Sequence, residues 1–288
     1  MCGVSPFDDS NEKPTPVDGT QRKPARMTSQ ELRIVDTIAQ PVPGMGPTEQ
    51  TRPSTTATTT IPSAVPALLG FVAGYMDSCT FLAFGGLFIA HLTGSFVVIG
   101  SQLVANNDGF LIKVLAIPVF FTAGVLTTVI VGAFGTGDRR GLTTTLALEA
   151  ALLAGLMLVG VSAESMTATS IAGLFGLSAM GVQSALGRLL LAQYGSTNVM
   201  TTNTTQLAID LTETLFAPLR NQRDSLGQAA GCRALARGRL VRLAPIVFGF
   251  VAGTAAGGLA YMSIGLDCVV LPIGIIAALA IWAARGKS

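Results

Sequence analysis

Two ionisable side chains stand inside a stretch that is otherwise almost wholly apolar. Asp77 is followed fourteen residues later by His91, the only histidine of the chain. An ionisable group at membrane depth costs about 2.5–3.5 kcal/mol on insertion scales, so it normally faces a cavity, a partner or an ion path. Histidine titrates near neutral pH and could relay protons with the carboxylate. The pair predicts a proton- or cation-coupling site or a substrate contact. The alternatives are that Asp77 caps the segment after it or is neutral and hydrogen-bonded, and that His91 is a hydrogen-bonded packing residue.

Short polar runs interrupt two of the apolar segments. They are Thr93, Gly94 and Ser95, and Thr201, Thr202 and Asn203. Non-helical backbone at membrane depth is tolerated only where protein or a water-filled cavity satisfies its polar groups. Two breaks that meet near the midplane would form a small polar site for a solute, and Gln183 could line it opposite Asp77. The alternative is that the hydroxyl groups bond between packed helices.

Several other acidic residues and two cysteines are not expected to take part in a functional site. Asp210 and Glu213 end a polar segment and are expected to stand in water near a basic loop. Glu149 is an isolated acid within an apolar run. Cys79 and Cys268 lie in apolar segments, where a free cysteine acts as a small hydrophobe.

The composition indicates which environment must position these groups. Of the 288 residues, 50% are hydrophobic and 12% are charged, and the mean hydropathy is +0.58. A soluble domain averages about 25% charged residues, and several windows reach the roughly 20 apolar residues that cross a bilayer. The sequence therefore predicts an all-α, polytopic transmembrane helical bundle, an integral multi-pass protein with the lipid bilayer as its partner. No feature identifies the membrane.

The transmembrane domain is predicted at 63–285, after a tail at 1–62 whose proline, threonine and mixed charge predict disorder. Its apolar segments are approximately 63–84, 86–105, 110–134, 142–162, 168–192, 197–216, 243–265 and 268–284. Six are expected to be full spans. The second and the sixth are expected to be broken or re-entrant, because both contain a polar run.

The arginines predict the orientation of these spans. A basic loop is expected at 217–242, with six arginines and one acid. Cytoplasmic loops carry the excess of Lys and Arg. Six spans place this loop, the arginines at 139–140 and the basic C-terminus on the same side. Both termini are therefore predicted to be cytoplasmic.

Weak internal similarity predicts two pseudo-symmetric halves, 63–163 and 164–285. The run at 93–95 aligns with 201–203, and Phe121 to Gly124 aligns with Phe250 to Gly253. Three spans in each half would make the second half inverted, which is the plan of many secondary transporters.

Glycines four residues apart occur in two of the predicted spans. Gly70 and Gly74 repeat this GxxxG spacing at Gly249 and Gly253, in a different register from the internal repeat. Such spacing lets helix backbones approach closely. It predicts close helix packing at both places.

These segments resemble the YoaK-type family of integral membrane proteins, a domain of unknown function. The resemblance begins at Gly74 to Asp77 and continues at Phe88 to Ser95, where the family has a G-x-x-D step and an F-x-x-x-x-T-G-N motif. Met180 to Ser184 resembles its M-G-x-Q-N pattern. Thr201 to Asp210 resembles its threonine-rich stretch ending in L-x-x-D.

The resemblance covers about residues 65–285 and implies a multi-span membrane protein with no established reaction. Ser95 and Ser184 stand where the family has asparagine. Both shorten a side chain that could coordinate a ligand.

Signatures of enzymes and of nucleic-acid binding are absent from the sequence. One histidine cannot supply the H-E-x-x-H motif, and Gly176 to Met180 has Met where the G-x-S-x-G elbow needs Gly. The four cysteines lack the spacing of a zinc site, and the net charge of +2 is too small to indicate nucleic acid. The sequence predicts no catalytic residues, no metal and no cofactor.

The function expected from these features is that of a secondary transporter or permease for a small solute, with a coupling ion or proton at Asp77. The alternative is a non-transporting membrane scaffold or assembly protein. A homo-oligomer is compatible with either.

Overall fold

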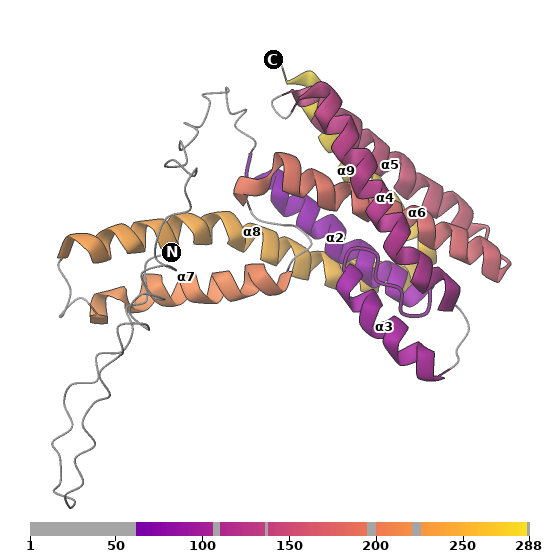
Figure 1. Ribbon diagram of the computed structural model, residues 1–288, viewed down its shortest axis with the longest axis horizontal. Coiled ribbons are helices and arrows are strands. Elements are labelled where there is room, and N and C mark those ends of the chain that lie inside the picture. Colours follow the sequence, from indigo (N-terminus) through magenta and orange to yellow (C-terminus); the bar gives the residue numbers. More distant parts are fainter. Residues whose placement is uncertain (1–61, 106–109, 136–137, 195–199, 221–225, 287–288) are drawn as a thin grey trace, which may run out of the picture. The chain divides into compact units, whose positions relative to one another are not determined.

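The computed structural model describes residues 62–105, 110–135, 138–194, 200–220 and 226–286. These residues form helices and short 3-10 turns, with no strand among them, which confirms the predicted all-α class. The elements are α2 (Ala64–Ala83), α3 (Leu92–Ala105), α4 (Phe110–Phe134), α5 (Arg139–Val161), α6 (Met166–Leu190), η1 (Ala192–Tyr194), α7 (Met200–Arg220), α8 (Leu226–Ile264), η2 (Gly265–Val269) and α9 (Val270–Arg285) (Figure 1). The tail predicted at 1–62 lies outside the described residues except for Pro62.

Five segments of the described chain are long and apolar enough to cross a membrane. The last, Arg233–Arg285, contains most of α8 together with η2 and α9. Gly265 has a φ of +62° and turns the chain between these two helices. By contrast α3 has 14 residues, about 21 Å, which is shorter than the hydrocarbon core of about 30 Å. The prediction of a helical membrane protein is confirmed.

The second apolar segment begins with non-helical backbone. It was predicted to start at residue 86, but α3 begins at Leu92 and residues 84–91 form a connector without helix. Gly85 and Gly86 start the connector with φ values of +59° and +90°, which residues with a side chain rarely adopt. A break is therefore present in this segment, and it lies before α3 rather than within it.

The matching break in the second half is not found. From Met200 to Arg220, α7 is an uninterrupted helix of 21 residues, so the run at 201–203 is its first turn. The aligned glycines also differ, since a Cβ at Gly124 would meet nothing within 4 Å whereas one at Gly253 would meet the backbone of another helix. The predicted internal repeat is not supported by these elements.

The basic loop predicted at 217–242 is mostly helical. Within it α7 continues to Arg220, and α8 begins at Leu226 and runs for 39 residues. Arginine, alanine and leucine are all good helix formers, so the helix extends beyond the apolar part that hydropathy detects. Residues 226–242 of the predicted loop are therefore helical.

Helices α2 and α8 pack in parallel through glycines, as the GxxxG spacing predicts. A Cβ at Gly70 would lie 2.8 Å from Ile246 O, and one at Gly249 would lie 2.5 Å from Ala67 O. Gly74 and Gly253 face the carbonyl oxygens of Phe250 and Phe71 even more closely. Because contacts are made backbone to backbone, no side chain larger than hydrogen fits at these positions.

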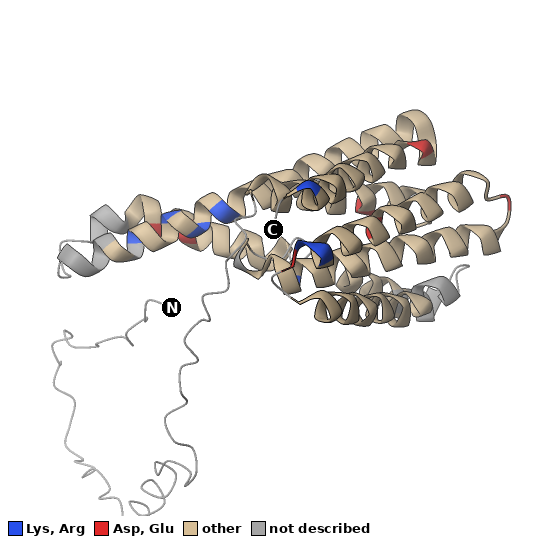
Figure 2. Ribbon diagram, turned by 90° about the horizontal axis from the view of Figure 1, so that it is seen from above, with Lys and Arg blue, Asp and Glu red and all other residues tan. Residues whose placement is uncertain are grey.

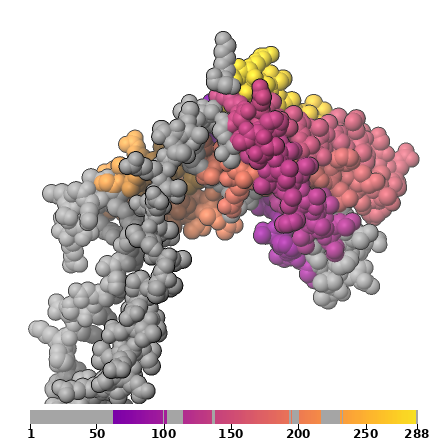
Figure 3. Space-filling model, turned by 45° about the horizontal axis from the view of Figure 1, so that its top comes forward, coloured from indigo at the N-terminus to yellow at the C-terminus, as the bar shows by residue number. Residues whose placement is uncertain are grey.

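Around this pair, α6 packs on α4 and α5, and α9 packs on α5. The space-filling view shows α4, in magenta, across the visible face (Figure 3). Most of its exposed side chains are apolar, including Phe121 at 72% and Val129 at 62% exposure, and the exposed Thr122 and Thr128 bond their hydroxyls back to the helix backbone. Such a surface suits contact with lipid rather than with water.

Basic side chains gather at one end of these helices. The guanidinium of Arg139, at the start of α5, lies 5.3 Å from the ring centre of Trp282, near the end of α9. Figure 2 shows the arginines, in blue, at this end and along α8, whereas the described residues at the opposite end carry acidic groups. This arrangement agrees with the predicted grouping of basic clusters, and the cytoplasmic orientation stays a prediction.

Candidate functional site

The carboxylate of Asp77 holds the connector 84–91 against α2. It is 5% exposed, and its Oδ1 accepts hydrogen bonds from the backbone N–H groups of Ile89, at 2.9 Å, and Ala90, at 2.6 Å. Its Oδ2 pairs with Nδ1 of His91. Buried backbone donors need acceptors, and here one carboxylate supplies them for the residues just before α3. Asp77 therefore has the capping contacts that the sequence left as an alternative.

His91 links this pair to α8. Its ring meets the ring of Phe250 edge-on, with the centroids 5.1 Å apart. The histidine side chain is 25% exposed, whereas that of Asp77 is 7% exposed. The pair thus has a buried acid and a base within reach of the surface.

The later part of the connector is buried, whereas Gly85 at its start is exposed. Leu87, Ile89 and Ala90 are each at most 2% exposed. A Cβ added at Gly176 of α6 would lie 3.1 Å from the side chain of Ile89. Non-helical backbone is therefore covered on the α6 side, as membrane depth requires.

The first polar run forms the beginning of α3. Ser95 is 1% exposed, and its hydroxyl donates to Phe88 O at 3.0 Å. Gly94 N–H donates to His91 O at 2.9 Å, and Thr93 is exposed. These residues adjoin the Asp77–His91 pair, so the structure brings five of the predicted site residues together.

The second polar run lies elsewhere. Thr201 and Thr202 are exposed in the first turn of α7, and Asn203 is 5% exposed. In the described residues α7 packs on α8, whereas α3 packs on α4. The contacts described give no shared pocket between the two runs.

Gln183 is also separate from the pair. It is fully buried on α6, and its Nε2 donates to Leu69 O on α2 at 3.0 Å. Leu69 precedes Asp77 by about two helical turns. Gln183 thus joins α6 to α2 about two helical turns away from the Asp77–His91 pair.

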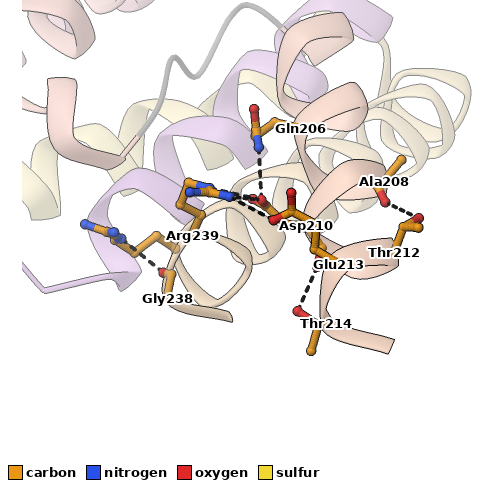
Figure 4. Close-up of polar contacts among 9 residues, drawn as sticks. Gln206, Ala208, Asp210, Thr212, Glu213, Thr214, Gly238 and Arg239 are labelled. Atoms are coloured by element: carbon orange, nitrogen blue, oxygen red, sulfur yellow. Dashed lines mark hydrogen bonds and ion pairs between the residues drawn. The ribbon is translucent and has the colours of Figure 1, made fainter. Parts of the chain in front are cut away.

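The interpretation of Asp210 was wrong. The residue was expected in water, but it is 0% exposed, and its Oδ1 accepts from Arg239 Nη2 at 2.6 Å and from Gln206 Nε2 at 3.0 Å. Arg239 also reaches Glu213 at 3.4 Å (Figure 4). The physical reason is that α7 and α8 lie side by side, which brings together two residues 29 positions apart.

Breaking this ion pair should weaken the contact of α7 with α8. In a double-mutant cycle of Asp210→Asn and Arg239→Gln, we expect a coupling energy of about 1–2 kcal/mol. This is below the value for a fully buried pair because the arginine side chain is 40% exposed. Thermal unfolding of the purified protein measures it. Arg237→Gln, an exposed change on the same helix, should be near neutral, and a coupling energy of zero would contradict the pairing.

The two buried cysteines meet, which their separate positions in the sequence did not indicate. Sγ of Cys79 on α2 and Sγ of Cys268 in η2 are 2.8 Å apart, and both thiols are free. The hydroxyl of Tyr75 donates to Cys268 O at 2.9 Å at the same place. Each cysteine acts as a small buried residue, as predicted, and together they join α2 to η2.

This proximity predicts an efficient crosslink. Treatment with the thiol oxidant diamide should join Cys79 to Cys268 within one chain, because bridging needs only a small movement of the two side chains. Mass spectrometry of the digested protein would identify the linked peptides. Cys79→Ser should abolish the link, and its absence from oxidised wild-type protein would contradict the packing of α2 on η2.

A further buried acid was not chosen as a site residue from the sequence. Glu149 is 0% exposed in the middle of α5, and neither carboxylate oxygen has a hydrogen-bond partner among the described residues. Its isolation in an apolar run was the available signal. The sequence alone gave no partner with which to interpret it.

The fold defines a helical membrane protein with buried acidic groups in ion pairs, Asp77 with His91 and Asp210 with Arg239. The chain belongs to the family described as Protein of unknown function (DUF1275), whose profile matches residues 65–282. The match confirms the domain of unknown function, and the YoaK-type name stays a resemblance. No similar chain was found among the curated proteins or the solved structures.

Proposed function

We propose that this protein is a secondary transporter or permease for a small solute, with the Asp77–His91 pair as its proton-responsive element. The observation that supports it is the attachment of the connector 84–91 to the pair. The same carboxylate that pairs with His91 also accepts the N–H groups of Ile89 and Ala90. Proton binding and the position of non-helical backbone are thereby linked.

In this proposal, protonation of Asp77 releases the connector and deprotonation holds it in place. A charged carboxylate accepts hydrogen bonds about twice as strong as those to a neutral group. A proton on Asp77 weakens the bonds to Ile89 and Ala90 and releases the connector, and loss of the proton restores them. By reciprocity, a solute that stabilises the released connector also favours protonation. Non-helical backbone next to helix ends holds substrates and coupling ions in many transporters.

Uptake into proteoliposomes tests the proposal. The full-length chain is reconstituted, a pH gradient is imposed, and the uptake of a panel of small labelled solutes is compared with that of protein-free vesicles. We expect gradient-dependent uptake of at least one class of solute. Uptake that never exceeds that of protein-free vesicles, across charged, zwitterionic and neutral solutes, would count against transport.

Two observations favour the scaffold alternative. Helix α8 is about 58 Å long, roughly twice the hydrocarbon thickness. Its neighbour α7 exposes Leu211, Leu215 and Phe216, at 47%, 59% and 55%. Exposed apolar side chains of this kind can mark a binding surface. A scaffold would retain its partners in Asp77→Asn, whereas a transporter would lose proton coupling.

A further inference from the structure

Glu149 is a buried acid whose oxygens lack hydrogen-bond donors. It lies near the middle of α5 at 0% exposure, with no partner for Oε1 or Oε2 among the described residues. Thr145, one turn earlier, donates its hydroxyl to Gly141 O at 2.8 Å, within its own helix. An unpaired carboxylate charge in an apolar interior is costly. Something outside the described hydrogen bonds must therefore neutralise this group.

Helix α6 carries the complementary polar group. Gln183 uses its Nε2 to bond Leu69 O at 3.0 Å, and its Oε1 has no partner among the described residues. Between the packed helices there are thus two acceptor groups without a hydrogen-bond donor among the described residues, the carboxyl group of Glu149 and the amide oxygen of Gln183.

The packing of α5 on α6 places these two residues at one level. A Cβ at Gly176 would lie 2.6 Å from Leu156, so these two positions face each other. The helices are antiparallel, because Gly160 similarly faces Ala172. Glu149 is seven residues before Leu156, and Gln183 is seven after Gly176. Seven residues are close to two helical turns. Glu149 therefore lies on the same face of α5 as Leu156, Gln183 lies on the same face of α6 as Gly176, and the two residues are opposite each other.

Other ionisable side chains lie away from this level. Of the elements packed on α5, α4 carries Lys113 in its first turn, and α6, α9 and η2 contribute Arg188, Arg285, Asp267 and Cys268. Lys113 is ten residues, nearly three turns, before Ala123, the α4 residue that faces Gly181 of α6. Arg188 and Arg285 are exposed near the ends of their helices. The turn η2 adjoins the far end of α5, where Leu266 meets Gly160. On α5 itself, Arg139 and Arg140 are at the start, more than two turns from Glu149.

We infer that Glu149 and Gln183 form a proton-binding site in which the protonated carboxyl of Glu149 donates to Oε1 of Gln183. One proton then removes the buried charge and gives the amide oxygen its donor. A metal cation fits less well, since calcium takes six to eight oxygen ligands and this level offers three. This site is separate from the Asp77–His91 pair of the proposed function, because Gln183 bonds Leu69 on α2, about two turns before Asp77. The inference therefore does not depend on transport.

Infrared spectroscopy of the full-length protein in lipid tests this site. Exposed Asp and Glu are ionised at neutral pH, so the C=O band of a protonated carboxyl should be visible against them. We expect this band in the wild type, its loss in Glu149→Gln, and its shift to higher frequency in Gln183→Leu, where the O–H loses its acceptor. Glu164→Gln, an exposed acid in the turn after α5, should leave the band unchanged.

The inference is overturned if the wild type shows no protonated-carboxyl band at neutral pH, whichever variants fold. It is also overturned if Glu149→Gln removes a carboxylate band instead, or if Gln183→Leu leaves the frequency unchanged. The readout is independent of solute uptake. A protein that shows the band but transports nothing would refute the proposed function and leave this site standing.

Discussion

Gly253→Ala is expected to remove most of the folded protein, although it adds one methyl group. The new Cβ would overlap the backbone of Phe71, including its carbonyl oxygen and Cα. Backbone cannot move aside as a flexible side chain can, so α2 and α8 would have to separate along their length. Overpacking typically costs 1–3 kcal/mol, and this contact should cost about 3 kcal/mol or more. Size-exclusion chromatography after heating measures the loss of the monodisperse protein.

Gly258→Ala provides the matched control on the same helix. A Cβ at Gly258 would meet nothing within 4 Å. Alanine is favoured over glycine in a helix by about 0.8–1 kcal/mol, so this variant should be as stable as the wild type or more stable. Equal stability of Gly253→Ala and Gly258→Ala would show that α2 and α8 do not pack through these glycines.

Replacements of Asp77 should separate its structural contacts from its charge. Asp77→Leu leaves the N–H groups of Ile89 and Ala90 without their acceptor. Each buried donor left unpaired costs about 1–3 kcal/mol, so little folded protein is expected. Asp77→Asn retains one oxygen for these donors and should fold. It cannot take up or release a proton, and we expect gradient-driven uptake to fall by about a hundredfold or more.

Glu164→Gln is the control for the loss of one negative charge, since Glu164 is exposed in the turn between α5 and α6. It should retain wild-type uptake and stability. Folded Asp77→Asn protein with wild-type gradient-driven uptake would contradict a coupling role for Asp77. Folded Asp77→Leu protein of wild-type stability would contradict its capping role.

Hydropathy was sufficient to predict most of the long helices. The segment predicted at 110–134 coincides with α4, and that at 63–84 differs from α2 by one residue at each end. Length and apolar composition determine such segments because each must cross the hydrocarbon core. The GxxxG contact was also predictable, because glycines at that spacing leave a flat helix surface wherever the partner lies.

Features that depend on chain reversals were not determined by the sequence, which offered capping by Asp77 only as one alternative. Asp77 meets the connector because Gly85 and Gly86 turn the chain back toward α2. Asp210 is buried because α8 continues as a helix before its apolar part and brings Arg239 alongside. Both contacts join residues far beyond one helical turn. Sequence spacing alone does not determine such contacts, which need the packed helices.

The most direct test of the central claim measures proton movement rather than uptake. Vesicles containing the full-length protein and a trapped pH-sensitive dye receive a gradient of a transported solute with no initial pH difference. We predict that the solute gradient alone changes the internal pH in wild-type vesicles, and that it does not in Asp77→Asn vesicles. Solute entry at the wild-type rate without any change in internal pH would contradict the account.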